Sequence, residues 1–195
     1  MSGLTLILVL AVVLAGYVVS LYNFFATTRT RIKASIQEIG NQLKRQADLI
    51  PNLEASVKGY LKHEKGILEA LASARKAVTS ASLGSSTSQQ AEASSAIADL
   101  LPKLNVVVES NPELKANTTV QQLMEELRDT SDKVMYARRT LIDLSADFNI
   151  KVVTFPSNLV AGVFGVKEVE GLKVGDMDRA TSVTAEETKS PKISL

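Results

Sequence analysis

The longest apolar run of the chain lies at its start and reads LTLILVLAVVLAGYVVSLYNFF, from Leu4 to Phe25. It contains no Asp, Glu, Lys, Arg or His. A helix through this run would be about 33 Å long, which is enough to cross the hydrocarbon core of a bilayer. Tyr17 and Tyr22 lie toward its C-terminal end, where aromatic rings collect at the lipid headgroups. The run therefore predicts an uncleaved transmembrane anchor over residues 1–25.

A cleaved signal peptide is the main alternative for this run, because it too is apolar and N-terminal. However, Met1-Ser2-Gly3 contains no basic residue, and the run is long for the apolar part of a signal peptide. The first cations, Arg29, Arg31 and Lys33, follow the run. The positive-inside rule then predicts a single-pass protein whose N-terminus lies outside and whose C-terminal domain is cytoplasmic.

Beyond the anchor, apolar positions recur with a helical period. Ile32, Ile36, Ile39 and Leu43 are three or four residues apart, with charged residues between them. The anchor helix is therefore expected to leave the membrane without interruption and to reach about Ala47.

The segment Asp48-Leu49-Ile50-Pro51-Asn52 permits two interpretations. Asp can cap a new helix and Pro fits its first turn, which would place a hairpin here and a second helix from Pro51 to about Ala81. The apolar phase nevertheless continues unbroken into Leu53 and Val57, as in one long helix with a proline kink. Periodicity alone leaves both interpretations open.

A loop and a further helix are expected next. Leu83 to Ser88, LGSSTS, has no periodicity and predicts the loop. The pattern then predicts a helix from about Gln89 to Ser110, in which Pro102 causes a kink or a later start. Asn111-Pro112 ends this helix, since the residue before Pro avoids the α region.

The last long helix is expected to start at Asn117 or Thr118 and to reach about Val153, where Phe155-Pro156 stops it. The apolar, Gly-punctuated segment from Leu159 to Val166 fits an ordered cover over the end of the bundle, a short strand or a segment dipping into the membrane surface. A packed terminal extension is favoured. From residue 176 onward the chain is polar and predicts a flexible tail.

Composition narrows the chemistry further. The net charge is +1, aromatic residues make up 5%, and Trp and Cys are absent from the 195 residues. A nucleic-acid partner is therefore not expected, and disulfides and thiol catalysis are excluded. His63 is the single His, and neither Tyr60 three residues before it nor Ile67 four residues after it completes a di-iron or zinc motif. We expect His63 to be solvated or hydrogen-bonded between helices, and we expect no metal, cofactor or catalytic residue.

Polar residues are interpreted first as structural. We expect one cluster to meet near the bundle ends as caps and ion pairs, with a docking site as the less favoured alternative: Asp48, Asn52, Glu109, Lys115, Asn117 and Arg138. A second group is expected to form a solvated face with pairs such as Asp129–Lys133: Glu125, Glu126, Arg128, Asp129, Asp132 and Lys133.

Three blocks of the chain resemble the LemA family: Leu43 to Glu64 (LKRQADLIPNLEASVKGYLKHE), Asn111 to Asn117 (NPELKAN) and Phe155 to Val166 (FPSNLVAGVFGV). They occur in the family's order and spacing, together with Ala137-Arg138-Arg139 and Phe148-Asn149. The positions that match the family's motifs are Asp48, Pro51, Asn52, Tyr60, Glu64, Pro112, Leu114, Lys115, Asn117, Arg138, Asn149, Phe155 and Pro156.

The sequence departs from the family pattern in three places. Leu141 and Ile142 stand where the family often has Tyr-Asn, Ser110-Asn111 replaces a more usual Asn-Tyr, and Phe25-Ala26 replaces Leu-Val. These departures concern the subfamily more than the fold.

The resemblance implies an all-α protein, with an N-terminal transmembrane helix that continues into an antiparallel up-and-down four-helix bundle over residues 26–156. It favours the hairpin at Asp48 to Pro51. The remainder divides into an apolar extension, 157–175, and a tail, 176–195. Relatives look like proteins of the bacterial cell membrane, some of them near membrane proteases or associated with internal membranes. The family's biochemical role is largely undefined.

Two functional hypotheses follow. The first is a non-enzymatic scaffold that contacts the lipid bilayer, forms a homo-oligomer and organises or shapes the membrane. Small residues suit close packing between copies as well as within the bundle; they are Ala70, Ala72, Ser73, Ala74 and Ala77, then Ala91, Ala93, Ser94, Ser95 and Ala96. The second is an accessory or adaptor subunit of a membrane-protein partner such as a protease. An enzyme is the weakest hypothesis, since no pair of carboxylates has a distinctive spacing.

Overall fold

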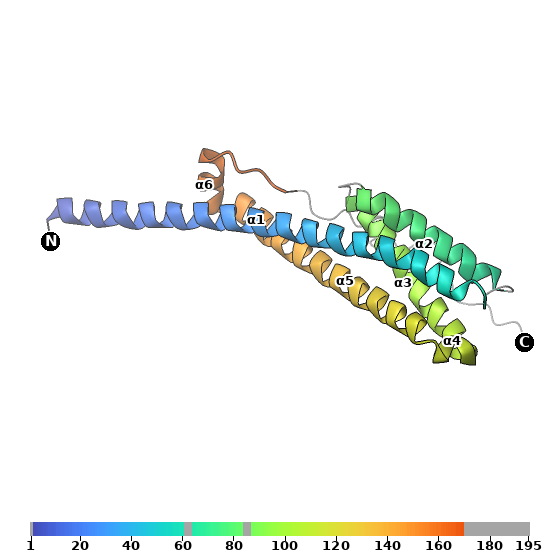
Figure 1. The fold of residues 1–195 in the computed structure, drawn as a ribbon. Helices are drawn as coiled ribbons and strands as arrows, with labels where there is room; N and C mark the ends of the chain where they lie inside the picture. The colour runs from blue at the N-terminus through green and yellow to red at the C-terminus, as the bar shows by residue number, and fades with distance from the viewer. Residues whose placement is uncertain (1, 61–63, 84–86, 170–195) are drawn as a thin grey trace, which may run out of the picture.

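The computed structural model describes residues 2–60, 64–83 and 87–169 of the chain. These residues contain helices and no strand, so the expected all-α class is confirmed. In chain order the helices are α1 (Gly3–Val57), α2 (Lys65–Leu83), α3 (Thr87–Ser110), α4 (Pro112–Ala116), α5 (Thr118–Val153) and α6 (Ser157–Val163) (Figure 1).

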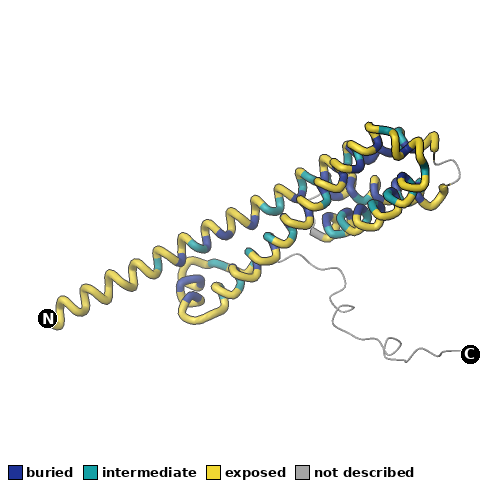
Figure 2. Tube along the Cα trace, turned by 90° about the horizontal axis from the view of Figure 1, so that it is seen from below, coloured by how far each residue is buried: buried dark blue, intermediate teal, exposed yellow. Residues whose placement is uncertain are grey.

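Helix α1 is the axis of the molecule. It has 55 residues and is therefore about 82 Å long. Every residue from Ser2 to Tyr17 is exposed, and Figure 2 shows this part projecting alone from the packed region. Among the described residues, α1 is the one helix long and apolar enough to cross a membrane. A signal sequence shares that length and composition.

Helices α1 and α5 pair along much of their length. The buried residues of α1 recur mostly at alternating steps of three and four, as in a left-handed coiled coil. Phe25 lies edge-on to Phe148, with ring centroids 5.5 Å apart. Farther from the N-terminus along α1, Arg45 Nη2 lies 3.3 Å from Glu126 Oε2 of α5. Moving outward along α1 therefore moves backward along α5, so the two helices are antiparallel.

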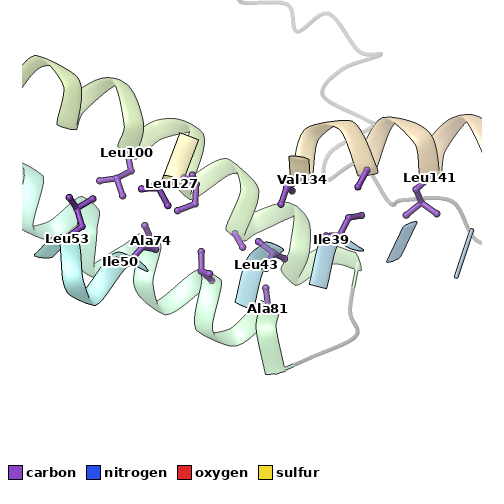
Figure 3. Packing of buried hydrophobic residues seen from close by; sticks show 14 of the residues in the cluster. Ile39, Leu43, Ile50, Leu53, Ala74, Ala81, Leu100, Leu127, Val134 and Leu141 are labelled. Carbon is purple, nitrogen blue, oxygen red and sulfur yellow. The ribbon is translucent and has the colours of Figure 1, made fainter. Parts of the chain in front are cut away.

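Helices α2 and α3 pack only against the outer part of this pair. Arg75 of α2 lies 3.4 Å from Glu54 of α1, and Arg128 of α5 donates a hydrogen bond to Asn105 of α3. Figure 3 shows Leu53, Ala74, Leu100 and Leu127 meeting between these helices. We call this part the head: α2, α3 and α4 with residues 39–57 and 118–137. We call the paired residues 21–36 and 141–153 the stalk.

The expected antiparallel up-and-down four-helix bundle is not confirmed. Helices α1 and α5 continue together past α2 and α3, so the packed region narrows toward the apolar end of α1 (Figures 1 and 2). The lengths explain this shape, because α5 has 36 residues while α2 has 19 and α3 has 24.

The hairpin expected at Asp48 to Pro51 is wrong. Helix α1 runs through Pro51 to Val57, and α2 begins at Lys65 instead of Pro51. The physical reason is burial: Ile50, Leu53 and Val57 are at most 1% exposed. Each such side chain contributes about 2 kcal/mol, which together offset the roughly 3 kcal/mol that a proline costs inside a helix. The alternative of one continuous helix is the one observed.

Asn52 supports the helix at the proline. Pro51 has no N–H, so the helical bond to the carbonyl of Ala47 is missing. On the next carbonyl along, Asn52 Nδ2 donates a hydrogen bond of 3.2 Å to the oxygen of Asp48. The side chain of Asn52 thus adds a donor in the turn from which the proline removes one.

Pro51→Ala is expected to raise the free energy of unfolding by about 2 kcal/mol, because alanine restores the missing helical bond. The measurement is urea unfolding of the full-length protein in mild detergent, followed by circular dichroism. Pro112→Ala is the matched control. Pro112 occupies the first turn of α4, where no bond is missing, so its replacement should change stability by less than about 0.5 kcal/mol. A loss of stability in Pro51→Ala would mean that the proline is needed for a turn.

The later helices follow the predictions closely. Helix α3 includes Pro102 and starts at Thr87, so the later start is wrong. It ends at Ser110 as predicted, but the short helix α4 that follows was not predicted. The predicted bounds of the last helix are confirmed by α5. Of the predicted loop, residues 84–86 lie outside the described residues.

The apolar segment after α5 is helical. Helix α6 buries Ser157, Val160 and Ala161, so a packed extension is observed and the strand is wrong. Gly165 ends it with a φ of +63°, which glycine adopts without strain. The Val166 N–H then reaches back to the carbonyl of Ala161 at 2.9 Å, the closing bond of a Schellman motif. The predicted polar tail lies outside the described residues.

Candidate functional site

The family-motif positions fall into four separate places and do not form one site. One group lies at the end of the head farthest from the apolar segment: Tyr60, Glu64, Pro112, Leu114, Lys115 and Asn117. Asp48, Pro51 and Asn52 lie on the part of α1 within the head, and Arg138 lies further back along α5. Asn149, Phe155 and Pro156 lie at the base of the stalk (Figure 1).

At the far end of the head, motif residues cap helices. Asn117 Oδ1 accepts hydrogen bonds from the N–H groups of Thr119 and Val120 and so caps α5. Pro112 stands in the first turn of α4, and Leu114 is fully buried. Lys115, Tyr60 and Glu64 are exposed. These contacts fix the α4–α5 corner and leave a polar, solvent-facing end.

The polar cluster expected near the bundle ends does not form. Asn52 bonds to Asp48 within α1, and Asn117 caps α5. Arg138 lies about 30 Å further along α5 than Asn117, so the two cannot meet. The cap expected of Asn117 is therefore confirmed, while the meeting of all six residues is wrong. Sequence position along a helix does not reveal which residues of other helices lie beside it.

Arg138 instead lines a small pocket of about 130 Å³ between α1, α3 and α5. Ser94, Ser95 and Ser131 contribute to the same pocket. Gln46 also lines it, and its buried Oε1 has no hydrogen-bond partner among the described residues. The pocket contains donors and acceptors but no pair of titratable groups for acid–base chemistry.

At the base of the stalk, aromatic rings join three segments. Phe25 contacts Phe24 and Phe148, and Tyr22 lies 5.1 Å from Phe164, measured between ring centroids. A groove of about 270 Å³ runs beside these rings and includes Arg29. The site therefore combines an apolar floor with one cation at the point where the apolar segment of α1 ends.

Asn149 ties the chain after α6 to the stalk. Its Nδ2 donates to the carbonyl of Val169 and its Oδ1 accepts from the Val169 N–H, both at 2.9 Å. This paired bonding replaces a backbone partner for a segment that has no secondary structure. It gives a physical role to a residue that the sequence identified only as a motif position.

The acidic face of α5 is exposed, as predicted. Lys133 Nζ lies 2.7 Å from Asp129 Oδ2, which confirms the expected pair. Glu126 pairs with Arg45. An open surface hollow is lined by Gln122, Glu125, Glu126 and Asp129. No group of three or more His, Cys, Asp or Glu side chains suited to a metal lies within the described residues. His63 lies outside them.

The small-residue faces divide between interior and surface. Ala74 and Ala93 are fully buried inside the head, so they are not contacts between copies of the chain. Ala72, Ser73 and Ser95 are exposed. The sequence left packing within the bundle and packing between copies both open, and for the buried pair the packing within the bundle is observed.

An apolar surface on α5 was missed. Met135, Ile142, Ile150 and Val153 are exposed. Their spacings of seven, eight and three residues keep them on one side of the helix, away from the buried face. We call these four residues the α5 stripe. The signal was present in the sequence as a second apolar period on the same helix, beside the stronger period of the buried face.

Comparison with known proteins identifies one matching family. The sequence model of the LemA family matches residues 35–185, most of the chain, in agreement with the resemblance seen in the motifs. The match begins within α1, after the apolar segment. No curated protein matches the chain.

Proposed function

The chain belongs to the LemA family, and we propose that it is a membrane-anchored, non-enzymatic helical scaffold that self-associates and organises the membrane around it. The observation that carries the proposal is the α5 stripe, an exposed apolar surface on the helix that packs along α1 beyond the apolar segment.

The anchor is supported by the way the apolar segment ends. Leu21 and Phe25 close the segment and are buried, Phe25 against Phe148 of α5. A cleaved signal sequence would have to leave this packed end intact, whereas an anchor continues into it without a break. Exposed Arg29, Arg31 and Lys33 follow within two turns and favour a cytoplasmic head.

Self-association is supported by the chemistry of the α5 stripe. Four large apolar side chains along one face of a helix are a common contact surface between helices, because burying each removes apolar area from water. The stripe lies on the stalk and the adjoining head, on a helix antiparallel to α1. Copies anchored in one bilayer would present their stripes at the same height. Lateral contact between copies therefore buries the stripe without moving any helix.

Ile142→Glu is expected to reduce the full-length protein to its monomer mass in mild detergent, because the carboxylate would be buried in the proposed contact. The measurement is light scattering after size exclusion. Gln122→Glu is the matched control: it places the same charge on α5 at an exposed side chain that lies about 160° around the helix from Ile142. An assembly of unchanged mass in Ile142→Glu would show that the stripe is not the contact.

The same stripe favours a second candidate, the accessory subunit of another membrane protein. A parent protein that is already a monomer would rule out self-association. In that case the stripe is available to a different helix, and the partner is sought by cross-linking through a cysteine introduced at Ile142. The natural chain has no cysteine, so cross-links would form only there.

A further inference from the structure

Helix α6 and the residues at its ends carry apolar side chains that nothing in the described part of the chain covers. Val163 is 82% exposed and Phe155 is 79% exposed. Leu159 and Phe164 are also exposed. We call these four residues the collar. The opposite face of α6, with Ser157, Val160 and Ala161, is buried, so the collar is the outward face of an ordered element.

The collar lies at the level where the apolar segment of α1 ends. Phe164 contacts Tyr22, and both residues line one groove together with Phe25. A hydrocarbon core of about 30 Å takes about 20 helical residues, so a span beginning at Leu4 ends close to Tyr22. Tyr22 and Phe164 therefore mark the boundary between acyl chains and headgroups.

Charge and direction agree with this level. Arg29 is exposed about 10 Å further along α1 than Tyr22, at the depth of lipid phosphates. Figure 1 shows α6 running across α1 instead of along it. When α1 stands upright in a bilayer, α6 therefore lies in the plane of the membrane surface, which is the orientation of interfacial helices.

We propose that the collar is embedded in the lipid bilayer at the boundary of headgroups and acyl chains, as a second membrane contact beside the transmembrane segment. This inference rests on the membrane anchor of the proposed function. It adds a second membrane contact, formed by the last helix of the chain. The lipid occupant follows from continuity: the collar adjoins the exposed apolar surface of α1, which only lipid covers when α1 spans the membrane.

Single tryptophans test the proposal directly, since the natural chain has none. The full-length variants Val163→Trp, Leu10→Trp and Tyr136→Trp are placed in phosphatidylcholine–phosphatidylglycerol nanodiscs at one copy per disc. Each is measured with quenchers attached near the lipid headgroup or near the bilayer centre. Leu10→Trp reports the span and Tyr136→Trp reports the water-exposed head. All three positions are exposed, so the fold should tolerate the ring.

The expected result is that Val163→Trp loses about half its fluorescence to the shallow quencher and less to the deep one. Leu10→Trp should respond mainly to the deep quencher, and Tyr136→Trp to neither. If Leu10→Trp is quenched but Val163→Trp behaves like Tyr136→Trp, the collar is not in the bilayer while the anchor stands. If Leu10→Trp is also unquenched, the anchor itself is wrong. A blue-shifted but unquenched Val163→Trp would mean that protein covers the collar, which also overturns the proposal.

Discussion

Ala74→Glu is expected to lower the free energy of unfolding of the head by about 4 kcal/mol. Ala74 is fully buried between α1, α2 and α3, as Figure 3 shows. A glutamate there must displace packed side chains and place a carboxylate where the described residues offer an apolar surrounding. The measurement is urea unfolding of the full-length protein in mild detergent.

Ala72→Glu is the control for this prediction. Ala72 lies on the same helix but is exposed, so its replacement should change stability by less than about 0.5 kcal/mol. The pair also separates folding from assembly. If Ala74→Glu kept the stability of the parent protein and changed only the mass of the assembly, Ala74 would be a contact between copies and the buried position would be contradicted.

Phe148→Ala is expected to destabilise the base of the stalk by about 4 kcal/mol. Phe148 is 1% exposed and packs edge-on against Phe25, so truncation leaves a cavity between α1 and α5. The head is packed by other residues and should remain folded. We therefore expect amide hydrogen exchange to accelerate in the last turns of α5 and in α6 while protection persists in α2 and α3.

The matched control for this prediction is Phe155→Ala. Phe155 is mostly exposed, so its loss should leave exchange within the stalk unchanged in detergent. Equal acceleration throughout the head in Phe148→Ala would contradict the division into head and stalk, since it would show that the whole packed region unfolds as one unit.

The bounds of α5 could be predicted because both ends carry local signals. Asn117 caps the start, and Pro156 follows closely after the end. Pro51 gave the opposite outcome. Asp48 and Pro51 are local signals for a new helix, yet the apolar phase through Leu53 and Val57 continued, and burial along a long interface exceeded the local preference. The continuous apolar period predicted the helix correctly because it reflects many buried contacts, whereas the capping signal reflects one turn.

The candidate surfaces were harder to predict than the helices. The sequence identified Ala74 as small but could not show that it faces α1 and α3 instead of another copy of the chain. It placed Asn149 in a motif, but its partner Val169 lies 20 residues away in an irregular segment. A residue on a long helix is buried only where a second helix packs beside it. Which stretches are packed depends on how the helices align along one another.

The continuity of α1 makes the protein a lever as well as a spacer. In the membrane-anchored arrangement proposed above, the helix from Tyr22 to Val57 would extend about 53 Å beyond the membrane boundary and would hold the far end of the head at that distance from the lipid. The same rod converts tilt into displacement: a tilt of about 10° at the membrane moves that end sideways by about 9 Å. Tilting is one way in which a spanning helix accommodates a bilayer thinner than its apolar segment. A partner bound at the α4 corner would therefore move when the membrane thickness changes, although the partner itself never contacts the membrane.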